Sequence, residues 1–343
     1  MPDQHVKVIL KQRPVGEPRA TDFAVVREPL PKPGDGEVLT RTIYLSLDPY
    51  MRGRISGESW RVARAYAAPV EIGQVIVGGT VGEVVESHHP AWKRGDLVLG
   101  SGGWQSHAVS NGSALRKLDP AAAPISTALG VLGMPGLTAY VGLLDIGRPN
   151  SGETVVVSAA SGAVGAVVGQ LAKVRGCRAV GVAGAEEKCR YVVDELGFDA
   201  CVSHREADLP GALRTACPNG IDVYFENVGG AVLDAVLGIV NRDARIPLCG
   251  LIAEYNATEP ERGPGWRALL TSRVMVKGFI VSDHADRMPD FLRDMSGWLR
   301  EGRVKYREDI VDGLERAPEA FIGLLRGRNF GKLLVRVGAD PTR

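Results

Sequence analysis

The sequence predicts a mixed α/β fold in which an all-β domain of irregular barrel type is followed by a doubly wound parallel sheet. Residues 1 to about 125 are rich in short β-strand patterns. These patterns are separated by residues typical of turns, such as glycine and proline. From about residue 126, strand and helix patterns alternate with short connections, which is typical of a parallel sheet with helices on both faces. The change of pattern therefore indicates a boundary between two domains.

The composition is that of an ordinary globular protein large enough for two domains. Of 343 residues, 45% are hydrophobic and 24% charged, and the formal net charge of +1 gives no reason to expect nucleic acid or a membrane surface as a partner. An apolar leader and a run of about 18 uncharged apolar residues are both lacking, so neither secretion nor membrane insertion is expected. The five cysteines stand singly, which predicts a reduced, cytoplasmic protein without a disulfide framework or a cysteine-based zinc site.

The first part of the chain carries four strand patterns. Residues 6–10 alternate weakly, and a turn rich in proline and glycine at 31–37 precedes a strand at 38–45. Residues 76–86 predict a bent strand whose glycines lie at the corners of a small barrel. The turn and strand at 93–100 complete this domain.

The second part alternates between the two kinds of element. Strands are predicted from residue 154 up to the turn at 158–165, and at 178–183, 200–203, 221–226, 244–249 and 273–281, with helices at 166–173, 186–196, 207–216, 231–240 and 287–301. A loop at 251–265 carries two prolines and little periodicity. The helix at 317–326 and the strand at 332–337 are expected to return to the first domain.

The turn between the first strand and helix of this second part gives the first sign of function. It matches the G-x-G-x-x-G template with Ala160 in place of the first glycine and with Gly162 and Gly165 retained. Small residues let the backbone approach a pyrophosphate, and the helix N-terminus presents free N–H groups to the anion. By itself the turn is equally typical of an ordinary strand–helix connection, so the dinucleotide hypothesis depends on the sequence that follows it.

The end of the next strand distinguishes the two nicotinamide cofactors. Enzymes for NADH usually have a carboxylate there that binds the ribose 2′-hydroxyl, but this strand ends in Ala183, Gly184 and Ala185. Lys188 and Arg190 follow in the next helix, and a pair of cations suits a 2′-phosphate. A solvated helix start would explain the same charges. The missing acid and the preceding turn favour NADPH.

Two later strand ends lie at the same edge of the sheet, where open α/β sheets bind ligands. Asn227, before two glycines, is placed to approach the ribose or the nicotinamide, although the pattern is at least as often a simple turn. Cys249 is more typical of a buried core thiol than of a nucleophile.

Six blocks in the sequence together resemble one family. They occupy residues 44–52, 133–140, 159–165, 225–230, 278–281 and 328–332. The chain is similar to the zinc-free medium-chain dehydrogenases/reductases, in the branch of prostaglandin reductases and NADP-dependent alkenal double-bond reductases. The resemblance implies a GroES-like catalytic domain of residues 1–125 plus 305–343, interrupted by a Rossmann NADPH-binding domain at 126–304. It also implies a homodimer built through the Rossmann domain.

The zinc-free branch is favoured by residues that the sequence lacks. The first 120 residues contain no cysteine, and the glycine-rich segment at 78–83 has no histidine, whereas zinc alcohol dehydrogenases carry ligands in both places. Without a metal to polarise an alkoxide, reversible alcohol oxidation loses its usual Lewis acid. Reduction of an electron-poor C=C bond does not need one.

The resemblance also assigns individual residues. Tyr255 matches the tyrosine that is thought to contact the substrate carbonyl, and Tyr50 matches a second tyrosine of the substrate pocket. A tyrosine that often helps to hold the 2′-phosphate is replaced here by His204, which is followed by Arg205, so we expect pH-sensitive NADPH affinity. With the residues argued above, the expected cofactor contacts are Met134, Thr138, Gly162, Ala163, Val164, Gly165, Gly184, Lys188, Arg190, His204, Asn227, Cys249, Ile252, Tyr255, Phe279, Ile280, Val281 and Asn329.

The predicted activity is NADPH-dependent reduction of the C=C bond of an α,β-unsaturated aldehyde or ketone, by hydride transfer to the β-carbon. The alternatives are a quinone oxidoreductase of the same superfamily, a non-catalytic NADPH-binding protein and a zinc-dependent alcohol dehydrogenase. Tyr255 and Tyr50 also fit simple packing roles, and His107 and His284 are interpreted as structural or surface residues. The segments 56–70 and 251–265 are expected to shape the substrate pocket.

Overall fold

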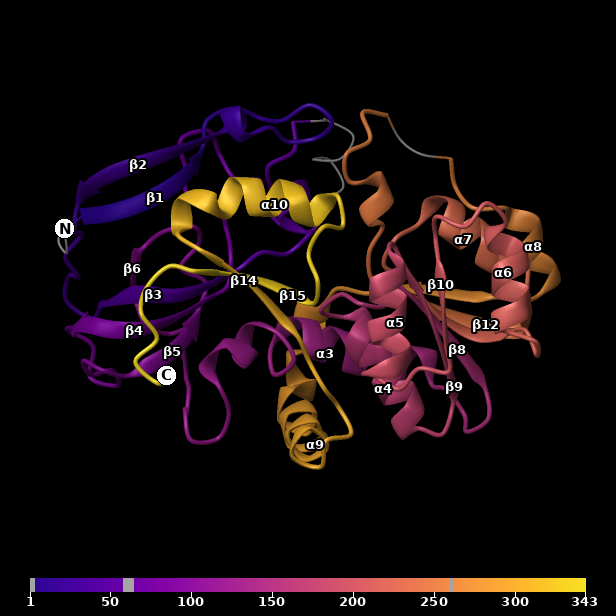
Figure 1. Ribbon diagram of the computed structural model, residues 1–343. Helices are drawn as coiled ribbons and strands as arrows, with labels where there is room; N and C mark the ends of the chain where they lie inside the picture. Colours follow the sequence, from indigo (N-terminus) through magenta and orange to yellow (C-terminus); the bar gives the residue numbers. More distant parts are fainter. Residues whose placement is uncertain (1–3, 58–64, 260–261) are drawn as a thin grey trace.

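The computed structural model describes residues 4–57, 65–259 and 262–343, and the strands in these residues form three sheets. A two-stranded sheet and a seven-stranded sheet make up what we call the first lobe, and a six-stranded sheet with its helices makes up the second lobe. The two lobes lie side by side, the first on the left and the second on the right of Figure 1. Within the described residues, no helix combines the length and apolar character needed to cross a membrane.

The first lobe is built mostly from antiparallel strands. β1 (Gln4–Leu10) pairs with β2 (Phe23–Pro29), and the larger sheet has the order β14-β15-β3-β4-β5-β7, with β6 also paired to β3. The strands of this larger sheet that come from the first part of the chain are β3 (Val38–Ser46), β4 (Thr80–Ser87), β5 (Leu97–Gly100), β6 (His107–Ser110) and β7 (Arg116–Lys117). The bounds of β14 and β15 are Glu308–Asp312 and Lys332–Arg336. Register shifts within the β3–β4 pair bend the sheet.

The end of the chain returns to the first lobe, as expected. β14 (Glu308–Asp312) pairs with β15 (Lys332–Arg336) in parallel, and β15 pairs with β3 antiparallel. Between them, η6 (Leu314–Arg316) and α10 (Ala317–Leu325) cover the lobe (Figure 1, yellow). Phe321 of α10 packs edge-on against the buried Trp104, with ring centroids 5.6 Å apart.

The second lobe confirms the doubly wound parallel sheet. Its strand order is β10-β9-β8-β11-β12-β13 and every pair is parallel, which is the order of a dinucleotide-binding fold. The strands are β8 (Thr154–Ser158), β9 (Arg178–Ala183), β10 (Ala200–Ser203), β11 (Ile221–Phe225), β12 (Val240–Leu248) and β13 (Met275–Gly278). The helices are α4 (Gly165–Val174), α5 (Glu186–Asp194), α6 (Leu209–Ala216), α7 (Gly230–Leu237), α8 (Trp266–Thr271) and α9 (Met288–Arg300).

Burial explains why β8 is the centre of this sheet. All five of its residues are buried, and its neighbours β9 and β11 cover its two edges. β-Branched residues at 154–157 therefore fill the space between the two layers of helices. The strand order reverses beside β8, which opens a crevice at the carboxyl ends of β8 and β11.

The structure corrects several predicted boundaries. The helix predicted at 231–240 ends at Leu237, and Val240 already begins β12. The strand predicted at 273–281 is paired with β12 only over Met275–Gly278, and the bent strand predicted at 76–86 begins at Thr80. The helix predicted at 207–216 begins at Leu209, because the side chain of Asp208 caps it by accepting from the Gly211 N–H.

Some elements were not predicted at all. They are β2, β6, β7, β14, α1 (Met51–Arg54), α8, and α3 (Met134–Tyr140) with the π-helical turn Val141–Gly147 that continues it. Short 3-10 turns at Ala20–Asp22, Ile125–Leu129, Ile252–Glu254 and Val281–Arg287 complete the chain. The turn Ile125–Leu129 packs in the core of the first lobe, beside Tyr44 and Val81.

Candidate functional site

The small-residue turn after β8 is tightly folded. Ala159 has a left-handed backbone with φ of +53°, which is rare for a residue other than glycine, and its carbonyl accepts from the Gly162 N–H at 2.9 Å. A Cβ on Gly165 would lie 2.4 Å from this carbonyl oxygen, so only glycine fits where α4 begins. The turn therefore brings bare backbone and the N-terminus of a ten-residue helix to one point, as a pyrophosphate requires.

The C-terminal segment of the first lobe reaches this turn. Gly331 forms a parallel bridge with Gly162, and its N–H donates to the Ser161 carbonyl at 3.1 Å. A small cavity beside the turn is lined by residues of both lobes, among them Gly162, Ala163, Tyr306 and Arg307. The Arg307 guanidinium lies 4.0 Å from the centre of the Phe330 ring. Sequence analysis missed Tyr306 and Arg307, because no local pattern indicates that their segment meets the turn.

Three basic side chains, of which Lys188 and Arg205 are cations and His204 is an imidazole that can be protonated, gather at the end of β9. A Cβ on Gly184 would lie 3.4 Å from the His204 ring, and both His204 and Lys188 interact electrostatically with Arg205. Burial, more than the charge of Arg205, lowers the pKa of Lys188, and partial burial together with Arg205 and Lys188 lowers the pKa of His204. No carboxylate ends β9, so this arrangement suits a phosphate rather than a free ribose hydroxyl.

Lys188 also joins the two lobes. Its side chain is buried, and its Nζ donates to the carbonyl oxygens of Gly327 at 2.7 Å and Asn329 at 2.6 Å. The Asn329 side chain donates to the Gly331 carbonyl at 2.9 Å, so this segment is a compact turn. The ammonium that is expected to meet the 2′-phosphate thus also holds the segment that carries Asn329.

Arg190 does not join this group. It forms an i,i+4 ion pair with Glu186 at 3.0 Å, and its side chain is 64% exposed. Arg190 lies two residues beyond Lys188 on α5, and this spacing turns it away from the face that carries Lys188. The expected pairing of Lys188 with Arg190 is therefore not seen, and the basic residues that act on each other at the end of β9 are Lys188, His204 and Arg205.

The end of β11 is held by a buried carboxylate. Glu226 Oε1 accepts from Ser158 Oγ at 3.0 Å, from the Tyr224 hydroxyl at 2.9 Å and from the Val228 N–H at 2.6 Å. Asn227 donates through Nδ2 to the Ser158 carbonyl at 2.9 Å, which ties the ends of β8 and β11 together at the crevice. Glu226 has no local motif that would have indicated this role.

Cys249 follows β12 at the same edge. Burial, with a smaller contribution from the charge of Glu226, raises the pKa of the Cys249 thiol to about 12. A neutral thiol is a poor nucleophile, which agrees with the interpretation of Cys249 as a packing residue.

Tyr255 stands directly above this edge. It follows the turn Ile252–Glu254, in which the Ile252 N–H donates to the Asn227 carbonyl at 3.1 Å. A Cβ on Gly250 would lie 3.2 Å from the Tyr255 hydroxyl, so the hydroxyl lies over the backbone that leaves β12. The structure therefore brings Tyr255, Ile252, Asn227 and Cys249 to one place.

Tyr50 belongs to the first lobe, where it immediately precedes α1. Burial, and then the charge of Asp48, raises the pKa of Tyr50 well above its usual value, and Tyr66 contributes to the same shift. Partial burial raises the pKa of Tyr66, and an electrostatic interaction with Cys249 adds to it, so Tyr66 lies near both Tyr50 and the end of β12. Tyr66 belongs to the segment 56–70 that was expected to shape the pocket, although the sequence did not single it out. Residues 58–64 of the segment expected to shape the pocket lie outside the described residues, as do residues 260–261 of the second segment.

The segment after β13 lies beside the end of β11. Phe279 packs edge-on against Phe225 with ring centroids 6.3 Å apart, and His284 packs against Phe279 in turn. Val281 begins a turn that contacts α3, where Thr138 Oγ1 donates to the Met134 carbonyl at 2.8 Å. Met134, Thr138, Phe279, Ile280 and Val281 therefore lie along one edge. His107 lies elsewhere, against His5 in the first lobe, where burial lowers its pKa to about 4.

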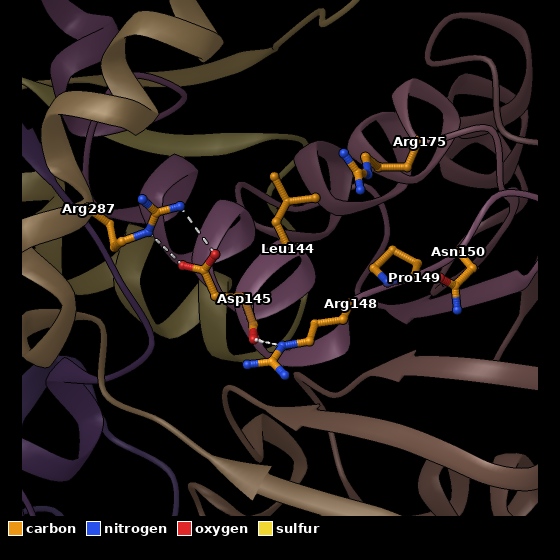
Figure 2. Close-up of a pocket in the computed structure, with 7 residues that line it drawn as sticks. All are labelled: Leu144, Asp145, Arg148, Pro149, Asn150, Arg175 and Arg287. Carbon is orange, nitrogen blue, oxygen red and sulfur yellow. Dashed lines mark hydrogen bonds and ion pairs between the residues drawn. The ribbon is translucent and has the colours of Figure 1, made fainter.

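An open cavity in the second lobe, beside the π-helical turn, is not part of this site. It has a volume of about 530 Å³, and Figure 2 shows the seven residues that line it, with Arg148, Arg175 and Arg287 among them. Arg287 is engaged by Asp145, at 2.8 Å and 3.2 Å, and by Asp290. None of the predicted site residues lines this cavity.

The comparisons with protein families agree with the geometry. Residues 7–118 match the family model "N-terminal domain of oxidoreductase", and residues 163–297 match the model "Zinc-binding dehydrogenase". Despite the second description, in the part of the chain that the structure describes, His, Cys, Asp and Glu side chains nowhere gather in threes that could hold a metal ion.

Relatives match over almost the whole chain. The NADPH-dependent curcumin reductase of Escherichia coli (strain K12) is 53% identical, covering 97% of this chain and 96% of that protein. Prostaglandin reductase 1 of Bos taurus is 41% identical, with coverage of 95% and 97%, and the NADP(+)-dependent 2-alkenal reductase of Nicotiana tabacum is 40% identical, with coverage of 97% and 98%. The crystal structure of CurA from Vibrio vulnificus in complex with NADPH is 50% identical, covers 98% of this chain and 100% of that one, and has a TM-score of 0.93.

Proposed function

The chain belongs to the zinc-independent medium-chain dehydrogenases/reductases, in the branch of curcumin, prostaglandin and 2-alkenal reductases, and we propose that it is an NADPH-dependent reductase of conjugated C=C bonds. Its substrates are α,β-unsaturated aldehydes or ketones. The observation that carries the proposal is the meeting of two features at the carboxyl edge of the parallel sheet: the basic side chains at the end of β9, and the Tyr255 hydroxyl over the backbone that leaves β12.

The residues present fit NADPH. The bare backbone at Gly162 to Gly165 would hold the pyrophosphate, because a side chain at Gly165 would collide with the Ala159 carbonyl. Lys188, His204 and Arg205 would bind the 2′-phosphate through charge-assisted hydrogen bonds. The ribose and nicotinamide would lie along the remaining predicted contacts, which are Met134, Thr138, Asn227, Cys249, Ile252, Tyr255, Phe279, Ile280, Val281 and Asn329.

When bound, NADPH supplies the hydride that is added to the β-carbon of the substrate. Negative charge then develops on the carbonyl oxygen as the enolate forms. The α-carbon of the enolate takes up a proton, from water or by way of a tyrosine, which gives the saturated carbonyl compound. The Tyr255 hydroxyl, held over the backbone at Gly250, is the donor that would stabilise this charge. A donor placed where charge develops is worth about 3–4 kcal/mol of the activation free energy. Tyr50, kept neutral by its raised pKa, would face the substrate from the other lobe.

The test is a panel of enals, enones and quinones, assayed with NADPH and with NADH by the loss of nicotinamide absorbance. We expect oxidation of NADPH by enones and enals, with the saturated carbonyl compound as product. Preference for quinones would support the quinone oxidoreductase instead. Tight NADPH binding without oxidation by any member would indicate the non-catalytic protein.

The Tyr255→Phe variant tests the donor role. We expect a fall in kcat of about 100-fold with the Kd for NADPH unchanged, because the variant keeps the ring and loses only the hydroxyl. An unchanged kcat would assign Tyr255 to packing.

We further propose a homodimer formed through the second lobe. β13 is the last strand of its sheet, and its Met275 and Val276 are 43% and 44% exposed. Trp266 and Leu270 of the adjacent α8 are 72% and 79% exposed. An open strand edge beside exposed apolar side chains is a surface that a second copy would cover.

We also propose limits for the two domains and a location in the cell. Residues 1–125 plus 305–343 would form the catalytic domain and residues 126–304 the NADPH-binding domain, in agreement with the sheet to which β14 and β15 belong. A cytoplasmic location is supported by the five cysteines, all of which carry free thiols.

A further inference from the structure

One arginine of the first lobe reaches the segment that carries Tyr255. Arg52 lies in the short helix α1, two residues after Tyr50, and is completely buried. Its Nε donates to Asn256 Oδ1 in the second lobe at 3.2 Å. Its Nη2 donates to the Gly16 carbonyl in the first lobe at 2.7 Å. The guanidinium therefore connects a fixed point of the first lobe with the residue next to Tyr255.

The surroundings strengthen this connection. A Cβ on Gly16 would lie 3.6 Å from Thr258 Cγ2 and 3.8 Å from the Asn256 carbonyl oxygen, so the Gly16 segment lies against the Tyr255 segment. Within its own lobe, the Tyr255 N–H donates to the Ile252 carbonyl and the Ala253 N–H donates to the Val228 carbonyl. The contact through Arg52 ties this segment to the first lobe.

Chemistry explains why arginine occupies this position. A buried cation is costly unless polar partners surround it, and the planar guanidinium can donate in several fixed directions at once. Lysine carries all its donors on one flexible nitrogen, so it lacks the planar group that directs separate N–H donors toward the two lobes at fixed angles.

We infer that Arg52 is a positioning residue for the reduction, which fixes the Tyr255 hydroxyl at the substrate carbonyl by holding Asn256 against the first lobe. The inference rests on the proposed donor role of Tyr255. In this arrangement α1 is linked to both tyrosines, because Tyr50 is its N-cap residue and Arg52 holds Asn256 beside Tyr255. Substrate reduction would therefore depend on Arg52 although Arg52 contacts Asn256 rather than the reacting atoms.

The test uses Asn256, because removing a buried arginine can impair folding. Asn256→Ala removes the acceptor, and we expect kcat with an enone to fall about tenfold, with the Kd for NADPH unchanged. Asn256→Asp keeps an acceptor oxygen and should retain most of kcat. The matched control is Asn241→Ala, because Asn241 makes similar hydrogen bonds, to Asn219 and Asp222, away from this segment. Its kcat should equal that of the unaltered protein.

A double-mutant cycle separates positioning from general damage. If Asn256 acts through Tyr255, then Asn256→Ala should cause no further loss of kcat in the Tyr255→Phe protein. An equal loss in both backgrounds, or an unchanged kcat in Asn256→Ala alone, would overturn the inference. An unchanged kcat in Tyr255→Phe would overturn the donor role and the inference together. Failure of the unaltered protein to reduce any enone would instead overturn the proposed function.

Discussion

Replacing Lys188 by methionine should separate NADPH from NADH binding. Methionine keeps the length and the apolar stem of the side chain, so the packing of α5 is retained while the charge and the donors are lost. In this structure the ammonium is buried and donates to the Gly327 and Asn329 carbonyls at 2.7 Å and 2.6 Å. The same group is the most enclosed of the three basic groups that we assign to the 2′-phosphate.

The expected change in the Kd for NADPH follows from the hydrogen bond that is lost. A hydrogen bond to a charged group contributes about 1.5–3 kcal/mol, and each 1.4 kcal/mol is a factor of ten in Kd. The Kd for NADPH should therefore rise by about 10- to 150-fold. NADH carries no 2′-phosphate, so its Kd reports only the loss of support for the segment at Gly327 to Asn329, and it should change by much less.

The assay is a fluorescence titration of each nucleotide against the purified variant. Arg190→Met is the matched control, because Arg190 lies on the same helix but is exposed and paired with Glu186. An exposed pair contributes about 0.2–1 kcal/mol, so we expect less than a fivefold change in the Kd for NADPH. An equal loss of NADPH and NADH affinity in Lys188→Met would refute the phosphate role and assign Lys188 to joining the lobes.

Three further outcomes are expected. Because partial burial and neighbouring cations lower the pKa of His204, the free imidazole is mostly neutral at pH 7, and a bound dianion favours its charged form. NADPH affinity should therefore strengthen as the pH falls from 8 toward 6.5, and a flat profile in His204→Gln, measured by the same titration, would confirm the source. Lys332→Met leaves the buried Asp48 carboxylate, 2.5 Å from Lys332 Nζ, without its cation. Urea denaturation should show a loss of about 3–5 kcal/mol in the free energy of unfolding, whereas Lys173→Met, which breaks a more exposed pair, should lose at most about 1 kcal/mol. Val276→Lys should convert the proposed dimer to monomers in sedimentation experiments, and an unchanged mass would exclude β13 as the interface.

Fully buried strands are easier to predict from the sequence than half-exposed ones. The strand β8 was identified because its β-branched residues are all buried and form one uninterrupted run. β2 and β14 were missed because half-exposed, charged residues interrupt their patterns. α3 was missed because Pro135 and Gly136 disfavour a helix locally, and burial of most of its residues in the tertiary structure overrides that preference.

The same limit applies to the candidate site. The glycine turn and Lys188 lie beside the strand ends of a single βαβ unit, where local spacing predicts position. Tyr306 and Arg307 reach the turn only through the return of the chain to the first lobe, and Arg52 reaches Asn256 only through the meeting of the lobes. Such long-range contacts leave no local pattern in the sequence.

The place of β15 has a consequence for biosynthesis. It lies between β14 and β3, so the sheet that contains β3 lacks an interior strand until residues 332–336 have left the ribosome. The parallel sheet, by contrast, takes all its strands from Thr154–Ser158 to Met275–Gly278 and can fold as soon as that stretch emerges. The nascent chain must therefore keep the open edge of β3 from pairing with other chains during most of translation, and a message truncated before residue 332 would yield a product prone to aggregation.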